Sequence, residues 1–142
     1  MKSNQIKKIV VATDGSKNSF RAGKLAIKIA KETGSQLIVV SVIADPPYMI
    51  AGPRYFSTAR RKWHKKWTDQ TLNLARSRGV KASAQILQST SVVKSLLDFA
   101  SSNNADLLVV GTRGLGAFER MTIGSVSSAV VNHATCSVLV VR

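Results

Sequence analysis

The sequence predicts an α/β protein with an open parallel sheet, and two observations carry this expectation. Five runs rich in Val, Ile and Leu have the length of β-strands, and longer segments with helical periodicity separate them; the runs are residues 7–14, 36–43, 81–88, 106–110 and 137–141. Strands that alternate with helices need crossover connections, which make neighbouring strands parallel and the crossovers right-handed. With 142 residues, 44% of them hydrophobic, the chain is expected to form a single domain, residues 1–142.

The first strand and helix are the most clearly marked elements. Residues 7–14 are rich in β-branched side chains and end at the turn Gly15-Ser16, after which a helix is expected over residues 17–33, stopped by Gly34. One side of this helix is small and apolar, and the opposite side carries a narrow basic stripe of Lys17, Arg21, Lys24, Lys28 and Lys31. The apolar side is expected to pack on the sheet and the basic stripe to face solvent.

The second strand, residues 36–43, is continuously apolar, as expected when helices cover both faces of a sheet. Residues 44–57, with three prolines and Gly52, are expected to form a long irregular connection of the kind that is often functional. A helix dense in Lys and Arg is expected over residues 58–78. Its Trp63 and Trp67 are expected to form a buried face, although the surrounding cations also permit a nucleic-acid or anionic-membrane interpretation.

The second half of the chain continues the alternation. Residues 81–88 alternate apolar and polar positions and are expected to form an edge strand, and Ser89 or Thr90 is expected to cap a helix over residues 91–102. Residues 106–110 are a buried strand, residues 123–134 a helix and residues 137–141 the last strand. The single cysteine, Cys136, is expected to be a small core residue with no chemical role.

The most informative motif lies between the fourth strand and the last helix. Gly111-Thr112-Arg113-Gly114 is followed after nine residues by Gly124-Ser125. Glycine permits positive φ and the close approach of a ligand to main-chain N–H groups, while a helix N-terminus presents unpaired donors. The spacing fits neither the Walker loop nor the dinucleotide fingerprint. It predicts a phosphate site, the alternative being that the glycines only shape the turn and allow tight helix packing.

These segments resemble the universal stress protein family, in its ATP-binding branch, over essentially the whole chain. The resemblance rests on the glycine spacing and on residues 9–16 (IVVATDGS), 37–43 (LIVVSVI), 105–114 (ADLLVVGTRG), 123–131 (IGSVSSAVV) and 136–142 (CSVLVVR). It implies a five-stranded parallel sheet in the order 3-2-1-4-5, a Rossmann-like fold of the adenine nucleotide alpha hydrolase type. Asp14 and Gly111 would then face each other across one crevice, where the winding of the sheet reverses.

The resemblance also implies an ATP site, with any Mg²⁺ held through the phosphates. Asp14 would accept hydrogen bonds from ribose hydroxyls, the alternative being a cap for the turn that follows it. Arg113 and Arg120 could meet phosphate oxygens or simply be exposed. The full set of implied contact residues is Ala12, Thr13, Asp14, Val42, Val110, Gly111, Thr112, Arg113, Gly114, Gly124, Ser125, Val126 and Ser127.

Charge and composition limit the kinds of partner that the chain is expected to have. The net charge of +14 indicates an anionic partner, and the resemblance implies a homodimer that pairs strand 137–141 with its mate. The first eight residues are polar and no run is long enough to span a bilayer, so the expected location is the cytoplasm.

Neither a nucleophile–base pair nor a metal-ligand spacing is present, because His64 and His133 have no clustered partners in the sequence. The expected function is therefore that of a stress-response regulatory homodimer that binds ATP and hydrolyses it slowly at most. The alternative is a basic module that binds nucleic acid or another polyanion through its Lys/Arg-rich helices.

Overall fold

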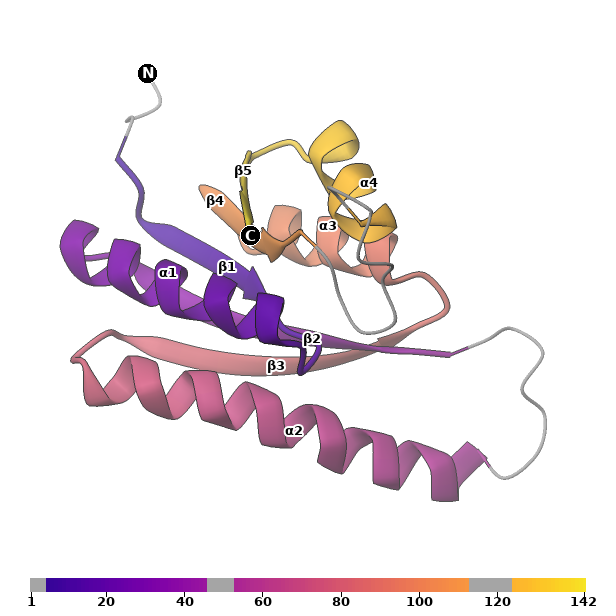
Figure 1. Cartoon of the computed structure of the whole chain (residues 1–142). Coiled ribbons are helices and arrows are strands. Elements are labelled where there is room, and N and C mark those ends of the chain that lie inside the picture. The colour runs from indigo at the N-terminus through magenta and orange to yellow at the C-terminus, as the bar shows by residue number, and fades with distance from the viewer. Residues whose placement is uncertain (1–4, 46–52, 113–123) are drawn as a thin grey trace.

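The computed structural model describes residues 5–45, 53–112 and 124–142 and shows a doubly wound α/β fold over them (Figure 1). The elements alternate along the chain: β1 (Lys8–Ala12), α1 (Lys17–Thr33), β2 (Gln36–Ala44), α2 (Pro53–Ser77), β3 (Ala82–Ser89), α3 (Val92–Ser102), β4 (Leu107–Gly111), α4 (Ser125–His133) and β5 (Ser137–Val141). All strand pairings are parallel and the sheet order is β3-β2-β1-β4-β5. The predicted fold class and strand order are confirmed.

The helices form a layer on each face of the sheet. α1 and α2 lie together on one face, and α3 and α4 lie on the other (Figure 1). Alternate strand residues supply two separate cores: Ile9, Val11 and Val39 pack toward α1 and α2, and Val10, Val40 and Leu108 pack toward α3 and α4. Because both faces are covered, the central strands are apolar at nearly every position, as the sequence predicted.

α1 has the bounds that its sequence signals predict. The hydroxyl of Ser16 accepts a hydrogen bond from the backbone N–H of Ser19, and Gly34 ends the helix with φ +70° in the left-handed region. All five cations of the predicted stripe are exposed, whereas Ala22, Ala26, Ile27 and Ala30 are buried. The amphipathic interpretation of this helix is confirmed.

α2 begins earlier than predicted. The irregular connection was expected over residues 44–57, but β2 extends to Ala44 and the helix starts at Pro53. Proline is compatible with the first turn of a helix because its missing N–H has no intrahelical acceptor there. The proline that suggested a loop is thus the first residue of the helix.

α3 is capped by Ser91, not by Ser89 or Thr90. The hydroxyl of Ser91 accepts from the backbone N–H of Lys94, and Ser89 instead accepts from the N–H of Ser91 in the turn before the helix. The other element boundaries agree with the predictions to within two residues, and the small differences arise because terminal residues are set by local hydrogen bonding that periodicity does not report.

The two tryptophans of α2 differ in burial, so the expectation that both form a buried face is wrong for Trp63. Its side chain is 47% exposed, whereas Trp67 is half-buried. Cys136 is half-buried against the α3–α4 core, forms no disulfide, and has its pKa raised mainly by burial, as expected of a core residue. Within the described part of the chain, no helix is both long and apolar enough to cross a membrane.

Candidate functional site

The candidate site lies where the sheet reverses its winding, at the carboxyl ends of β1 and β4. These strands are neighbours, with Val10 opposite Leu108 and Val11 opposite Val109. From β1 the chain moves to β2 on one side, while β4 and β5 lie on the other. Open α/β sheets bind ligands in the crevice at this point. The predicted residues that follow β1 and those that end β4 are therefore brought to one edge, as the resemblance implied.

Thr13, the first residue after β1, is fixed by three hydrogen bonds. Its backbone N–H donates to the Val40 carbonyl at 2.9 Å, and its hydroxyl lies 3.2 Å from that of Ser19. Its carbonyl accepts from the Ser41 hydroxyl at 2.8 Å, and the Thr13 side chain is buried. These hydrogen bonds fix the end of β1, Ala12 and Thr13, directly before the turn that carries Asp14.

Asp14 organises the turn between β1 and α1. Its Oδ1 accepts the backbone N–H of Ser16 at 2.9 Å, and its own N–H points to the Ser19 hydroxyl at 3.3 Å. The turn passes through Gly15, whose φ of +88° places it in the left-handed region. A carboxylate has two oxygens and several acceptor positions. The turn-capping role is therefore present and is compatible with a contact to a ligand.

Gly111 ends β4 beneath the first turn of α1. A Cβ at this position would lie 3.1 Å from both the carbonyl carbon and the carbonyl oxygen of Asn18. The Asn18 side chain donates to the Thr112 hydroxyl at 2.7 Å, which ties the two segments together. Gly111 does not have positive φ, so the expectation of that backbone geometry is wrong here. Close approach of the α1 backbone explains the glycine instead.

Thr112 joins three elements. Its N–H donates to the Val141 carbonyl at 2.8 Å, and its carbonyl accepts the Gly124 N–H at 2.5 Å and the Ser127 hydroxyl at 3.0 Å. The end of β4 and the start of α4 are therefore held side by side. The predicted contacts Arg113 and Gly114, and Arg120, lie outside the described residues.

The N-terminus of α4 has no side-chain cap. Gly124 occupies the cap position with φ −72° and ψ 166°, an extended conformation that needs no glycine, so positive φ is excluded here as well. Ser125 and Val126 are exposed, whereas Ser127 is buried with its hydroxyl bonded to the carbonyls of Thr112 and Gly124. Without a capping side chain, the first N–H groups of the helix can meet an anion.

Val42 lies on β2 beyond the end of β1. The pairing of β1 with β2 ends at Ala12 and Val40, so Val42, two residues further along β2, lies beyond the last residue of β1. The Val42 side chain packs toward the α3–α4 core. The backbone contacts expected of Val42 stay a prediction.

Ser41 and His64 form a polar link to the site that the sequence did not reveal. His64 Nδ1 lies 2.5 Å from the Ser41 hydroxyl, and that hydroxyl donates its one proton to the Thr13 carbonyl. Nδ1 must therefore carry the proton that His64 shares with Ser41. The pKa of His64 is lowered by burial and then by the charge of Arg60, while Asp14 acts in the opposite direction. Ser41 lies within an apolar run, and nothing in its pattern marks it as polar and bonded.

Trp67 packs on the turn next to Asp14. A Cβ on Gly15 would lie 2.7 Å from Cδ1 and from Nε1 of the Trp67 ring. Glycine at this position thus serves two purposes, since it adopts positive φ and leaves room for the indole. Neither segment of the sequence indicates the contact between Gly15 and Trp67, because these residues come together only when α2 packs against the sheet.

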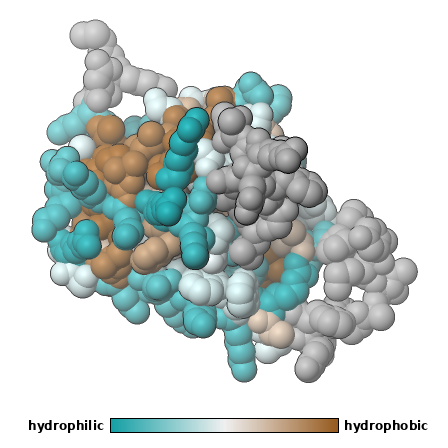
Figure 2. All heavy atoms as spheres, viewed as in Figure 1, coloured by the Kyte–Doolittle hydropathy of each residue, from teal (hydrophilic) through white to brown (hydrophobic). Residues whose placement is uncertain are grey.

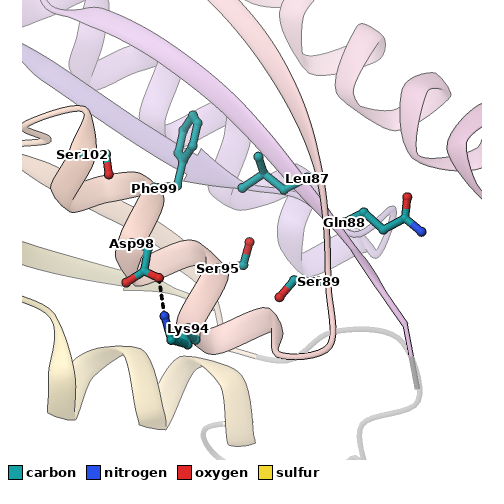
Figure 3. Close-up of a pocket in the computed structure, with 8 residues that line it drawn as sticks. All are labelled: Leu87, Gln88, Ser89, Lys94, Ser95, Asp98, Phe99 and Ser102. Carbon is teal, nitrogen blue, oxygen red and sulfur yellow. Dashed lines mark hydrogen bonds and ion pairs between the residues drawn. The ribbon is translucent and has the colours of Figure 1, made fainter. Parts of the chain in front are cut away.

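A separate pocket of about 320 Å³ lies between β3 and α3 (Figure 3). Leu87 and Phe99 contribute apolar walls, and the Lys94–Asp98 ion pair lies on the helix side of the pocket. β3 is separated from β1 by β2, so the pocket is remote from the β1–β4 edge and contains none of the predicted contact residues. Among the described residues, no three His, Cys, Asp or Glu side chains are grouped so as to hold a metal ion.

A doubly wound parallel sheet, with an acidic turn and an uncapped helix N-terminus at its reversal point, places this chain in the class of α/β proteins that bind ligands at that point. The model of the Universal stress protein family matches residues 5–142. The chain belongs to the universal stress protein family.

Known proteins agree with this assignment. Universal stress protein MJ0531 of Methanocaldococcus jannaschii is 33% identical over 98% of this chain and 84% of its own length. The structure of UspA from Lactobacillus plantarum superposes with a TM-score of 0.88 and 24% identity, covering 97% of this chain and 99% of its own. A universal stress protein solved in complex with cAMP has a TM-score of 0.69 and 27% identity, covering 97% of this chain and 98% of its own.

Proposed function

We propose that this protein is a regulatory nucleotide-binding protein that takes ATP at the carboxyl edge of β1 and β4. Binding, with at most slow hydrolysis, is the activity proposed, because the sequence pattern indicates no nucleophile–base pair. We also propose that the chain is a single domain, acts in the cytoplasm and forms a homodimer. The relative crystallised with cAMP supports an adenine nucleotide as the ligand class.

The observation that carries the proposal is the pairing of Asp14 with the uncapped start of α4 at one edge. Asp14 lies on the turn after β1, and the start of α4 is joined to the end of the adjacent β4 by the bond between Gly124 N–H and the Thr112 carbonyl. An acceptor for ribose hydroxyls and a set of N–H donors for phosphates are thus offered by neighbouring strands.

We assign the adenine, ribose and phosphate parts of the nucleotide to different described segments. The main chain of Val42 extends past β1 and can meet the adenine edge, and Asp14 can accept from the ribose. The N–H groups at Ser125 and Val126 can donate to phosphate oxygens, while that of Gly124 is bonded to the Thr112 carbonyl. The buried hydroxyl of Ser127 is already bonded to two carbonyls, so we assign it the role of holding the start of α4 in place.

The proposed ribose contact is tested by calorimetric titration of ATP into Asp14→Asn. Asparagine retains an oxygen for the Ser16 N–H, so the turn is kept while the charge is lost. Asp106→Asn is the matched control: this carboxylate accepts the N–H groups of Lys7 and Lys8 at the start of β1, the opposite edge of the sheet. Loss of a charge-assisted hydrogen bond costs about 1.5–3 kcal/mol, or roughly 10- to 150-fold in Kd.

The expected result is that Asp14→Asn weakens binding by this factor and Asp106→Asn leaves it unchanged. Equal Kd values for the two variants and the unaltered protein would contradict the role of Asp14.

The proposed dimer rests on the open edge of β5. This strand pairs with β4 on one side only, and Val138, Leu139 and Val140 are half-buried in a single chain. Figure 2 shows hydrophobic side chains gathered toward the β1, β4 and β5 side of the molecule. Pairing with a second β5 would cover the unpaired backbone groups. The Val141 carbonyl accepts from Thr112 on the β4 side, so the main-chain groups of Val140, one residue earlier, face the open edge. Sedimentation should give twice the chain mass, and replacing Val140 with proline, which removes an N–H donor on that edge, should give the monomer.

A further inference from the structure

The helices α1 and α2 together contain more than half of the Lys and Arg residues of the protein. These two helices contain twelve Lys and Arg and only two acidic residues, whereas α3 and α4 contain one Lys and one Asp, which pair with each other. Both basic helices cover the same face of the sheet (Figure 1). The charge is therefore segregated onto one side, which we call the basic face; its exposed cations are Lys17, Arg21, Lys24, Lys28, Lys31, Arg61, Lys62, Lys65, Lys66 and Arg76.

Few acidic groups balance this face. Among the described residues of α1 and α2, Asp69 forms an ion pair with Lys65, and Glu32 lies at the end of α1. The α1 stripe runs from Lys17 to Lys31, a distance of about 21 Å at 1.5 Å per residue. In Figure 2 hydrophilic side chains line the rim along which α2 runs. A row of cations of this length attracts a chain of phosphates and releases its counterions.

Trp63 lies within the basic face and is available for stacking. It is 47% exposed, and its sequence neighbours on the surface are Arg61, Lys62, Lys65 and Lys66. Trp67 holds it edge-to-face with ring centroids 5.5 Å apart, and Trp67 is itself packed on Gly15. The contact with Trp67 therefore fixes the orientation of the exposed Trp63 ring, and unpaired bases stack on aromatic rings of this kind when cations surround them.

We propose that the basic face binds single-stranded nucleic acid, with Trp63 as a stacking platform. Base pairs of a duplex are already stacked on each other, so an exposed indole favours an unpaired strand. A membrane surface fits less well, because the apolar side of α2 is used against the sheet and, among the side chains of α1 and α2 that the structure describes, Trp63 is the one large apolar side chain that is exposed. The proposal is independent of the nucleotide site.

The test measures the fluorescence anisotropy of labelled dT20 and rU20 against the intact protein between 0.05 and 0.3 M salt. One variant changes Arg61, Lys62, Lys65 and Lys66 to Gln. Its charge-matched control changes four exposed cations outside the basic face to Gln, namely Lys7, Lys81, Lys94 and Arg142. If all four basic-face cations meet phosphates, the log–log salt slope falls by about 3, at about 0.7 per contact with a single strand, and affinity at 0.15 M falls at least tenfold. The control is expected to change affinity less than threefold.

The stacking role has its own readout. Trp63→Leu keeps an apolar side chain and the same charge, and it is expected to weaken binding roughly 5- to 150-fold. In Trp67→Phe, where Trp63 is the one remaining tryptophan, strand binding should quench the fluorescence. Circular dichroism checks that each variant is folded.

Three results would overturn the proposal: no binding at 0.05 M salt, equal losses in the two charge variants, or no effect of Trp63→Leu. Tighter binding to vesicles containing 30% phosphatidylserine than to either oligonucleotide would overturn it too, because the partner would then be a membrane.

Discussion

The contact between Gly15 and Trp67 allows a prediction whose magnitude can be worked from geometry. In Gly15→Ala the new Cβ would lie 2.7 Å from Cδ1 and Nε1 of the indole and 3.1 Å from Cε2. The backbone at this position also has φ +88°, which L-residues with a side chain rarely adopt. Two separate costs therefore act on one substitution.

Each cost can be estimated. The left-handed backbone costs about 1–2 kcal/mol for a residue with a Cβ, and overpacking against a ring costs about 1–3 kcal/mol. Gly15→Ala is thus expected to lower the free energy of unfolding by about 2–5 kcal/mol. Gly34→Ala is the matched control, because Gly34 has φ +70° and nothing within 4 Å of its Cβ position. Gly34→Ala should lower the free energy of unfolding by the backbone term alone, about 1–2 kcal/mol.

The assay is a double-mutant cycle by urea unfolding, followed by circular dichroism. Trp67→Val removes the ring atoms that the new Cβ would meet, so Gly15→Ala in that background should cost no more than Gly34→Ala. The coupling energy is expected to be about 1–3 kcal/mol. Equal costs for Gly15→Ala and Gly34→Ala in the unaltered background, or a Gly15→Ala cost that Trp67→Val leaves unchanged, would refute the reasoning.

Three further predictions concern the polar link and the thiol. Ser41→Ala leaves a buried carbonyl at the end of β1 without its donor and should lower the free energy of unfolding by about 1–3 kcal/mol, whereas Ser77→Ala, at an exposed serine, should change it by less than about 0.5 kcal/mol. Because the pKa of His64 is lowered in the folded protein, the unfolded chain binds the proton at a higher pH, and the free energy of unfolding should fall as the pH drops below 6.5 toward that lowered pKa. His64→Asn should remove this part of the pH dependence, measured as urea midpoints at pH 5.5 and 7.5. An unchanged pH dependence would contradict the prediction. The raised pKa of Cys136 predicts slow reaction with a thiol reagent at pH 8 in the folded protein and fast reaction in urea; equal rates would show that burial does not protect it.

The fold could be predicted closely because its signals are local. The Ser16 cap, the Gly34 stop and the buried runs on β1, β2 and β4 each follow from residue type and periodicity. The start of α2 was missed because proline marks both loops and first helical turns. Periodicity alone could not separate these two cases at Pro53.

The site was predicted in part, and what was missed depends on tertiary packing. Asp14, Gly111 and Gly124 lie at the expected strand and helix ends, since each is coupled to an element boundary. The reason for Gly111 was different from the one expected, because the approach of Asn18 from another element decides it. Likewise His64 reaches Ser41 only when α2 packs on β2, and of the two tryptophans it is Trp67 that packs on Gly15, whereas Trp63 is exposed. Such contacts join residues far apart in sequence, and no local pattern encodes them.

Calorimetric titration of ATP into the purified protein tests the central claim most directly, with Gly124→Val and Ala134→Val as a matched pair. Gly124 and Ala134 flank α4 at opposite ends in similar extended conformations, so both variants place a branched side chain beside the same helix. The account predicts saturable heat with one site per chain for the unaltered protein and for Ala134→Val, and at least tenfold weaker binding for Gly124→Val, where the branch covers the N–H groups of the helix start. No heat with the unaltered protein, or equal affinity in all three proteins, would contradict a phosphate site at the start of α4.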